Sequence, residues 1–387
     1  MIARHESYVE KETPSMNIED LHNLQNDPYN YALRLKKEGG KKVVGYFCSY
    51  TPEELIFAAG ATPFRIFGTR SNINLADAHL QSYCCSPVRI ALEEALSGKT
   101  TVLDGIVFPH TCDSIQRLSD IWRLNVPLPF HIDVVLPVKL NSESAREYMI
   151  DVLHKFMKEL EKNLEVKITE EALRHAIALY NKIRESIKTI SDMRLINPSL
   201  LKGSDFYSIV KSSMIMDRND LAQILSHIIQ DLEAKKETPD VTFRKRLVLT
   251  GAMCNHPDFY QIVEDGGGVV VWDDLCTGSR YFEGQLDSTG DPVISIAERY
   301  LHRIECPAKH SGLSTRAENL LDIVQNKNAD GVVFLIHKFC DPHSFDYPYL
   351  KKHLDNERIP NTLIEMEDQA SIGERLKTRF EAFLEMI

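Results

Sequence analysis

The sequence predicts two doubly wound α/β units joined by a helical segment. Short β-rich runs alternate with helical stretches from about residue 40 to 140 and again from about residue 241 to the end, a pattern typical of parallel βαβ units. Between these regions the chain reads almost entirely as amphipathic helix. The two β-rich regions also repeat their motifs in the same order. We therefore predict an N-terminal helical extension, a first α/β domain, a helical connecting region and a second α/β domain at residues 1–40, 41–140, 141–240 and 241–387.

The first α/β domain begins with the apolar run 42–47, which reads as a buried strand. Thr51 is predicted to be the N-cap of a helix over residues 53–59, with Pro52 at its first helical position. Two further strands are predicted at residues 64–67 and 104–108. Strands separated by helices in this way favour parallel pairing.

The helical connecting region contains two clear helix starts. Ser144 fits a capping box ahead of an amphipathic run, and Thr169 is predicted to cap the next helix. Ile168 and Leu173 are spaced as a hydrophobic staple across that second start. Pro198 then interrupts the pattern before helices resume. The region contains no cysteine, and we interpret it as packing and spacing material.

The second α/β domain resembles the first in the order of its motifs. In the first domain one strand leads to Cys48, and a later strand leads to Cys112 and an aspartate. In the second domain the corresponding strands lead to Cys254 and to Cys340, which is again followed by an aspartate. We interpret the two domains as copies of one doubly wound unit, with the strands of the second predicted at residues 246–251, 269–272 and 331–336.

Charge and hydropathy exclude two classes of partner. The 387 residues include 45 Lys and Arg against 56 Asp and Glu, so the net charge of -11 disfavours binding to a nucleic-acid backbone. We see no apolar run of membrane-spanning length, and the charged N-terminus lacks the apolar stretch of a signal peptide. We expect a cytoplasmic protein with neither a nucleic acid nor a membrane as its partner.

The chain has 8 cysteines, which is a large set for a protein whose thiols stay reduced. Such a set points to metal or redox chemistry, and the alternative is a scatter of buried thiols that act as small hydrophobes. The positions favour the first reading, because four cysteines follow predicted strands, where open parallel sheets bind their ligands. These four are Cys48, Cys112, Cys276 and Cys340.

Two more cysteines precede prolines. Cys85 is predicted at the start of a helix, where a thiolate is stabilised, and Cys306 directly precedes Pro307. Six soft ligands gathered in one cleft can hold Fe–S clusters or several zinc ions. The paired C-x-x-C knuckles of structural zinc and the local ferredoxin run are both absent from the sequence. Ligands spread this far along the chain favour a cluster held between domains.

Five segments together resemble the 2-hydroxyacyl-CoA dehydratase and benzoyl-CoA reductase family. They are GYFCSYTPEELIFAAG, PHTCDS, DDLCTGSR, KFCDP and TRFEAFLEM, at residues 45–60, 109–114, 273–280, 338–342 and 378–386. The resemblance implies two flavodoxin-like domains and an oxygen-sensitive Fe–S site. It also implies a separate ATP-hydrolysing Fe–S activator protein that injects a low-potential electron. In the dehydratases that electron reaches the thioester carbonyl of an acyl-CoA, and the resulting ketyl radical expels the hydroxyl.

The cysteines of this chain match two branches of that family differently. In the dehydratases three cysteines hold a [4Fe–4S] cluster, and the matching positions are Cys85, Cys112 and Cys340. The double-cubane cluster proteins use six, and this chain has cysteines at the three extra positions as well, Cys48, Cys276 and Cys306. The resemblance therefore favours a double-cubane [8Fe–9S] cluster, with [4Fe–4S] as the alternative.

Two cysteines remain outside that set of six. Cys254 is interpreted as structural. Cys84 lies beside Cys85 and leaves the choice of ligand between them open, and we favour Cys85.

Two further side chains are candidate catalytic acids or bases, Glu54 and His110. Glu54 follows Cys48 at the start of a helix, where carboxylates are also common for dipole reasons. His110 precedes Cys112, although a histidine hydrogen-bonded within a loop is the plainer interpretation.

The first hypothesis is therefore an Fe–S-dependent reductase or (R)-2-hydroxyacyl-CoA dehydratase-type lyase that acts on an acyl-CoA or a small molecule. We expect it to pair with an identical copy or with a paralogous subunit. The alternatives are a non-catalytic Fe–S electron carrier or scaffold subunit, and a zinc-stabilised α/β binding protein.

Overall fold

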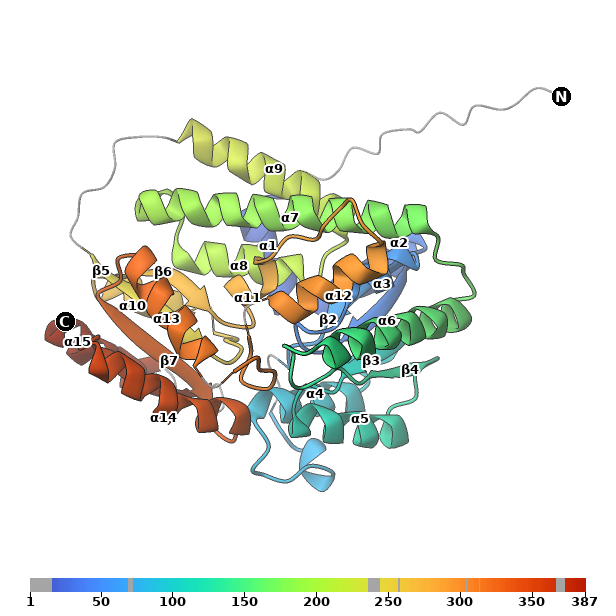
Figure 1. The fold of residues 1–387 in the computed structure, drawn as a ribbon, viewed down its shortest axis with the longest axis horizontal. Helices are drawn as coiled ribbons and strands as arrows, with labels where there is room; N and C mark the ends of the chain where they lie inside the picture. The colour runs from blue at the N-terminus through green and yellow to red at the C-terminus, as the bar shows by residue number, and fades with distance from the viewer. Residues whose placement is uncertain are drawn as a thin grey trace.

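The computed structural model describes residues 16–68, 72–235, 244–256, 258–303, 305–312, 314–366 and 373–387. Two four-stranded sheets lie side by side beneath a layer of long helices (Figure 1). Their strand orders are β2-β1-β3-β4 and β6-β5-β7-β8, and every neighbouring pair is parallel. Because both sheets have the same order relative to the chain, the structure confirms two flavodoxin-like parallel-sheet units.

The first sheet has its two central strands, β1 and β3, almost fully buried. Pro63 lies in β2, and a proline is tolerated there because β2 is an edge strand of the sheet. The prediction placed this strand at residues 64–67, after the proline. Because the proline is part of the strand, β2 begins three residues earlier, at Ala61. The strands are β1 (Lys42–Tyr46), β2 (Ala61–Arg65), β3 (Gly105–Pro109) and β4 (His131–Val134), and the helices beside them are α3 (Glu53–Ala58), α4 (Ser86–Leu96) and α5 (Asp113–Asn125).

The second sheet repeats this arrangement with longer strands. Gly251 ends its first strand with φ 144, and a Cβ there would lie 2.0 Å from the Leu335 carbonyl oxygen, so only glycine fits. The strands are β5 (Lys245–Gly251), β6 (Gly268–Asp274), β7 (Gly331–His337) and β8 (Asn361–Met366). The helices are α10 (Asp258–Asp265), α11 (Ser279–Phe282), α12 (Pro292–His302), α13 (Thr315–Asn326), α14 (Asp341–Asn356) and α15 (Gly373–Met386).

The helical layer spans both units. Helix α7 crosses above both sheets in Figure 1 and contacts α3 of the first unit as well as α11 and α12 of the second. The sequence places Ala172, Leu173, Ala176, Ile177 and Tyr180 on one face at helical spacing, and all of them except the half-buried Ala172 are buried in α7. The layer consists of α6 (Glu143–Leu164), α7 (Glu170–Ile196), α8 (Gly203–Ser213) and α9 (Arg218–Ala234). Helix α1 (Ile18–Asn26) packs against α8, whereas α2 (Pro28–Gly39) packs against β1. Short 3-10 turns lie at Ala76–Ala78, Lys99–Val102 and Pro198–Leu200.

The structure confirms one predicted helix cap and corrects two. Thr169 caps α7, and its side chain accepts a hydrogen bond from the Ala172 amide. The prediction for Ser144 was wrong, because Ser142 caps α6. The prediction for Thr51 was also wrong: its hydroxyl instead donates to the Phe47 carbonyl at 2.5 Å, and Pro52 is the N-cap of α3.

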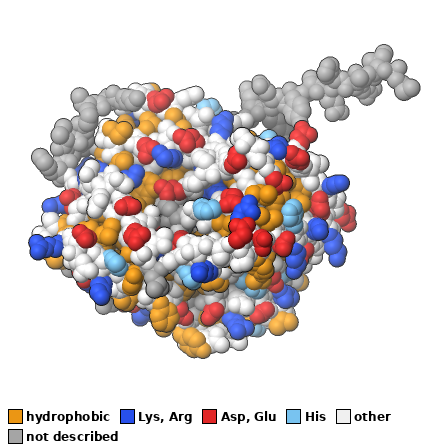
Figure 2. All heavy atoms as spheres, in the orientation of Figure 1, with side chains coloured by type: hydrophobic (Ala, Val, Ile, Leu, Met, Phe, Trp, Pro, Cys, Tyr) orange, Lys and Arg blue, Asp and Glu red, His pale blue; other side chains and the backbone are white. Residues whose placement is uncertain are grey.

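The boundaries predicted at residues 40, 140 and 240 stay predictions. Residues 1–15 of the predicted extension and residues 236–240 of the predicted connecting region lie outside the described residues. Within the described ranges, no helix is both long enough and apolar enough to cross a membrane. Figure 2 shows acidic, basic and hydrophobic side chains interspersed over one face of the molecule.

Candidate metal centre

Six cysteine side chains line one cavity of about 130 Å³, to which both α/β units contribute. A single water molecule needs roughly 10–15 Å³ of such space, so the cavity has room for a larger group. The six are the residues that the sequence analysis proposed as metal ligands. Their role as ligands stays a prediction, but the structure does bring together Cys48, Cys85, Cys112, Cys276, Cys306 and Cys340.

Four of these cysteines reach the cavity from the carboxyl ends of strands. Cys48 follows β1 and Cys112 follows β3 in the first sheet, while Cys276 follows β6 and Cys340 follows β7 in the second. Each lies within three residues of the last residue of its strand. The carboxyl ends of parallel strands share one edge of a sheet, so the strand order within each sheet accounts for the grouping.

Three of the cysteines are also the N-caps of helices. Cys85 precedes α4, as the sequence predicted, and Cys112 and Cys340 precede α5 and α14 in the same way. A helix N-terminus favours a thiolate because its free N–H groups and its dipole attract negative charge. The backbone amides of Val88 and Ile115 act in this direction on the first two thiols.

Burial opposes this stabilisation of the thiolates. It raises the pKa of Cys85 and of Cys112 to about 12 and that of Cys306 to about 11, and the neighbouring sulfurs add to each shift. Burial also raises the pKa of Cys340. These four thiols therefore favour the neutral form unless a cation lies among them, and a coordinated metal ion is such a cation because it deprotonates its thiol ligands.

A second cavity of about 670 Å³ adjoins the first and divides the six cysteines into two groups. Cys85, Cys112 and Cys340 line both cavities, and we call them the outer cysteines. Cys48, Cys276 and Cys306 line only the first cavity, and we call them the inner cysteines. The outer cysteines occupy the positions that match the dehydratase pattern, and the inner cysteines are the additional set.

Two residues in these loops have left-handed backbone that favours glycine. Cys48 itself has φ 56, and Phe339, directly before Cys340, has φ 62. Such conformations in non-glycine residues cost of order 1–3 kcal/mol and persist where the surroundings hold them. Both occur where the chain turns from a strand toward the cavity.

A buried arginine holds the loop that carries Cys276. The Arg280 guanidinium contacts Asp274 with its Nε 2.6 Å from Oδ1, and another of its nitrogens lies 3.9 Å from the Cys276 sulfur. Arg65 lines the same cavity and donates to the Cys276 carbonyl at 3.0 Å. Two guanidinium groups therefore lie beside Cys276, and that of Arg280 is paired with Asp274.

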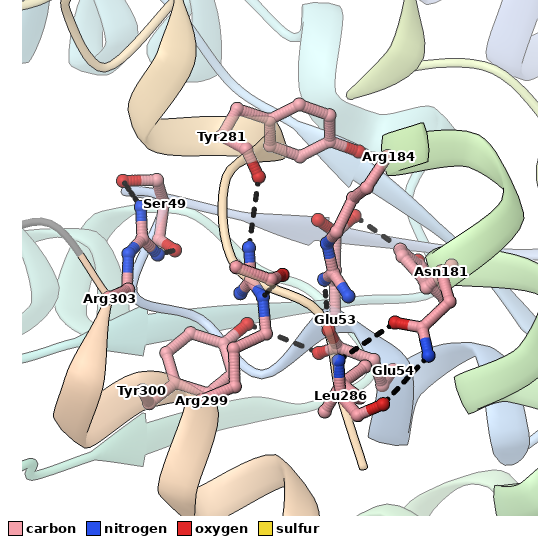
Figure 3. A network of polar contacts seen from close by, with 12 residues as sticks. Ser49, Glu53, Glu54, Asn181, Arg184, Tyr281, Leu286, Arg299, Tyr300 and Arg303 are labelled. Carbon is pink, nitrogen blue, oxygen red and sulfur yellow. Dashed lines mark hydrogen bonds and ion pairs between the residues drawn. The ribbon is translucent and has the colours of Figure 1, made fainter. Parts of the chain in front are cut away.

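Glu54 lies in a network of buried ion pairs and is not among the residues that line either cavity. Its carboxylate pairs with Arg184 of α7 and accepts a hydrogen bond from the Tyr300 hydroxyl at 3.2 Å (Figure 3). Burial raises the pKa of Glu54, but the charges of Arg184 and Arg299 outweigh it and lower that pKa below its usual value. These contacts tie α3 to α7 and α12, and the predicted acid–base role of Glu54 stays a prediction.

His110 is likewise not among the residues that line either cavity. Its Nε2 lies 3.0 Å from Oδ1 of Asp133, which belongs to β4, so the histidine is hydrogen-bonded across to the neighbouring strand and not within its own loop. Two other histidines do line the first cavity, His337 and His343, and burial lowers the pKa of His337 to about 4. The Nε2 of His337 contacts the Met253 carbonyl at 2.6 Å, and this contact requires a proton on that nitrogen.

The two remaining cysteines are not among the residues that line either cavity. Cys84 packs into the hydrophobic core around α4, and Cys254 is fully buried in the core of the second unit. Cys85 therefore lines both cavities while its neighbour lines neither, and the choice of Cys85 as the metal ligand stays a prediction. Among the described side chains, no three of the types His, Cys, Asp and Glu are arranged to hold a single metal ion. The six sulfurs surround a cavity and do not converge on one point.

The fold and these motifs agree with known proteins. A model of the family described as 2-hydroxyglutaryl-CoA dehydratase, D-component, matches residues 48–387. This chain belongs to that family. The match begins at Cys48, so it includes all six cysteines of the cavity.

Known proteins match this member of the D-component family over most of its length and most of their own. The chain is similar to the (R)-phenyllactyl-CoA dehydratase beta subunit of Clostridium sporogenes, with 27% identity over 95% of this chain and 98% of the relative. It is similar to one of the benzoyl-CoA reductase subunits of Thauera aromatica, with 28% identity over 85% and 87%. It is also similar to the beta subunit of the (R)-2-hydroxyglutaryl-CoA dehydratase of Acidaminococcus fermentans, with 24% identity over 96% and 98%.

The sequence analysis did not identify three basic residues close to the six cysteines. Arg280 ends the DDLCTGSR motif, four residues after Cys276, yet its contact with that sulfur depends on the turn into α11. Arg65 carries no local signal, because it is one residue of an apolar edge strand. Lys309 follows Cys306 by three residues and is fully buried. Arg280 and Lys309 could have been found from the sequence, because each lies within four positions of a candidate ligand. Arg65 could not.

Proposed function

We propose that this chain is the Fe–S subunit of a 2-hydroxyacyl-CoA dehydratase- or benzoyl-CoA reductase-type system. In this proposal it receives low-potential electrons from an ATP-dependent activator protein and carries out reduction or reductive dehydration. The observation that carries the proposal is the convergence of six cysteines on one cavity between two parallel sheets. The similar proteins, which are dehydratase beta subunits and a reductase subunit, support the reaction class.

The residues present fit an iron–sulfur group. Thiolates are the protein ligands that hold such clusters, and six are available. Apolar side chains, including Phe47, Ile66 and Val88, line the same cavity and limit the access of water. When bound, the group would supply one-electron transfer at low potential.

The two groups of cysteines have different tasks in this proposal. All six hold a double-cubane [8Fe–9S] cluster, and a [4Fe–4S] cluster on the outer cysteines is the alternative. The outer cysteines also face the larger cavity, which is where we place the reacting group of an acyl-CoA or a small molecule. Asp113, His310 and Arg316 line that cavity and can orient the substrate or exchange protons with it.

A second candidate function is a non-catalytic Fe–S electron carrier or scaffold. The observation that favours it is that Glu54 and His110, the predicted acid–base residues, are not among the residues lining either cavity. The relatives are also named as single subunits of larger enzymes. In either case we propose a cytoplasmic protein that pairs with an identical copy or with a paralogous subunit.

The first test is the metal content of protein that has been purified or reconstituted without oxygen. We expect about eight irons per chain for the double cubane and about four for the single cubane. Zinc without iron would overturn both forms of the proposal. Replacing Cys276→Ser separates the two forms, because it should lower the iron content of a six-ligand site and leave a site held by the outer cysteines unchanged.

The second test separates an enzyme from a carrier. The loaded protein is assayed with activator, ATP and reductant on 2-hydroxyacyl-CoA and aromatic acyl-CoA substrates, together with its partner subunit if it has one. Turnover supports the enzyme. Reduction of a fully loaded centre by the activator, without turnover of any substrate, supports the carrier.

A further inference from the structure

Lys309 is a buried cation near the first cavity, and it has no acidic counterpart in the part of the chain that the structure describes. Its side chain is 0% exposed, and none of the described carboxylates forms an ion pair with it. Arg280 is equally buried, but Asp274 neutralises its charge. An uncompensated ammonium in a protein interior is unfavourable unless other negative charge lies near it.

The backbone around Lys309 joins the two α/β units. Its amide donates to the Cys306 carbonyl at 2.8 Å, which closes the turn that follows that cysteine. The next residue, His310, forms an isolated parallel bridge with Lys139, and hydrogen bonds of 3.0 and 2.9 Å link it to Val138 and Leu140. The turn of the second unit that carries Cys306 is therefore fastened to the segment that follows β4 in the first unit.

The side chain of Lys309 reaches the carboxyl edge of the first sheet. Its Nζ donates to the Leu136 carbonyl at 3.0 Å and lies 3.5 Å from the His110 carbonyl. Leu136 follows β4, and His110 follows β3 and precedes Cys112 by two residues. An ammonium has three N–H donors, so two of them are directed at these backbone carbonyls. This anchoring fixes the position of the charge.

The cysteines of the first cavity lie close to this ammonium group. Lys309 donates its amide to the Cys306 carbonyl, and its Nζ lies 3.5 Å from the carbonyl of His110, two residues before Cys112. Once a bound metal deprotonates them, Cys48, Cys306 and Cys112 are the sulfurs whose charge interacts with Lys309. The three come from the loops after β1, α12 and β3. Lys309 thus lies among the sulfurs of two inner cysteines and one outer cysteine, where the two groups meet.

We propose that Lys309 is a positioning residue whose fixed positive charge offsets the negative charge of Cys48, Cys112 and Cys306 when they bind iron, and so makes the centre easier to reduce. The inference rests on the proposed iron–sulfur function. Each reduction adds one electron, supplied by the activator protein of that proposal, and therefore one negative charge. A fixed cation nearby stabilises the reduced form more than the oxidised form.

The test is a comparison of reduction potentials in reconstituted full-length protein. Lys309→Met removes the charge, Lys309→Gln removes the charge but keeps amide donors, and Lys309→Arg keeps the charge. Lys139→Met is the matched control, because it removes the same charge from an exposed position in the bridge beside His310. Thermal unfolding of the metal-free proteins identifies any variant that fails to fold before the potentials are compared.

We expect the ratio of reduced to oxidised centre at a fixed solution potential to fall about tenfold in Lys309→Met or Lys309→Gln, which corresponds to about 59 mV for a one-electron couple. Lys309→Arg should stay within about twofold of the unsubstituted protein, and Lys139→Met should leave the ratio unchanged. Loss of iron in the two neutral variants but not in Lys309→Arg also supports the inference.

Three outcomes would overturn the inference. The first is an unchanged ratio in a neutral variant that is fully loaded with iron. The second is an equal fall in Lys139→Met. The third is loss of iron or of folding in Lys309→Arg as well as in both neutral variants. That result would show that Lys309 acts through the packing of its side chain and not through its charge. Failure of the unsubstituted protein to bind iron would instead refute the proposed function itself.

Discussion

The Cys85 side chain lines both cavities, whereas that of its neighbour Cys84 lines neither. Cys85 is the N-cap of α4, and Cys84 packs into the hydrophobic core beside that helix. The two thiols are adjacent in sequence and differ in what surrounds them. They therefore provide a matched pair for testing the metal centre.

Replacing Cys85→Ser should remove about half or more of the bound iron, because serine is a poor substitute for a thiolate ligand. Cys84→Ser should bind as much iron as the unsubstituted protein. Iron and acid-labile sulfide, measured after anaerobic reconstitution, check both expectations. Loss of iron in Cys84→Ser with full binding in Cys85→Ser would reverse the assignment that the structure supports.

Replacing Glu54→Gln should destabilise the fold by about 3–5 kcal/mol, because Arg184 would be left as an unpaired buried charge. The free energy of unfolding from denaturant titration of the metal-free protein measures this. Glu170→Gln is the control, since its pairing with Arg174 is exposed and should contribute less than about 1 kcal/mol. A protein of normal stability that loses all turnover would instead support the acid–base role predicted for Glu54.

The grouping of the cysteines could be predicted because it follows from the topology of a parallel sheet. Cys112 and Cys340 each follow a buried apolar strand, and such strands carry a strong sequence signal. The repeated motif order then indicated a second edge of the same kind. These patterns are short-range, but they place the cysteines together because the carboxyl ends of parallel strands lie at one edge of a sheet.

The parts that the sequence left out depend on long-range contacts or on weak local signals. Strands β4 and β8 were missed because they are edge strands, partly exposed and interrupted by charged residues such as Asp133 and Glu365. The partner of Glu54 is Arg184, which lies 130 positions away, and no local pattern pairs them. Lys309 is similar, since its neighbours belong to four separate loops.

Asp133 should make the stability of the fold depend on pH in the acid range. Burial raises its pKa, but hydrogen bonds from His131, Ser119 and His110 outweigh burial and hold that pKa well below its usual value. A carboxyl whose folded-state pKa is depressed stabilises the protein above its unfolded-state pKa of about 3.9, and the stabilisation is lost as the pH falls through the folded-state value.

Asp133→Asn should therefore be less stable than the unsubstituted protein near neutral pH, by on the order of 1 kcal/mol because the side chain is partly exposed. The difference should narrow as the pH falls below about 4. Free energies of unfolding measured between about pH 3 and pH 7 check this. The exposed Asp151→Asn on α6 is the control, and a difference that stays constant across the range for Asp133→Asn would contradict the expectation.

Gly251 connects the second sheet to the candidate metal centre. A Cβ at this position would lie 2.0 Å from the Leu335 carbonyl oxygen of β7, and the Gly251 carbonyl accepts a hydrogen bond from Arg280 at 2.9 Å. Gly251→Ala should therefore destabilise the protein by more than about 4 kcal/mol and lower its iron content, since β5 and β7 must separate and Arg280 must move.

Gly60→Ala is the matched control for this prediction. Gly60 also has a positive φ, 79, but no described atom lies within 4 Å of the position where its Cβ would be. Backbone strain alone should cost about 1 kcal/mol there and leave iron binding unchanged. Unfolding and iron content are measured for both variants in parallel. Equal destabilisation of the two would show that the left-handed backbone, and not the close approach to Leu335, is what requires glycine at residue 251.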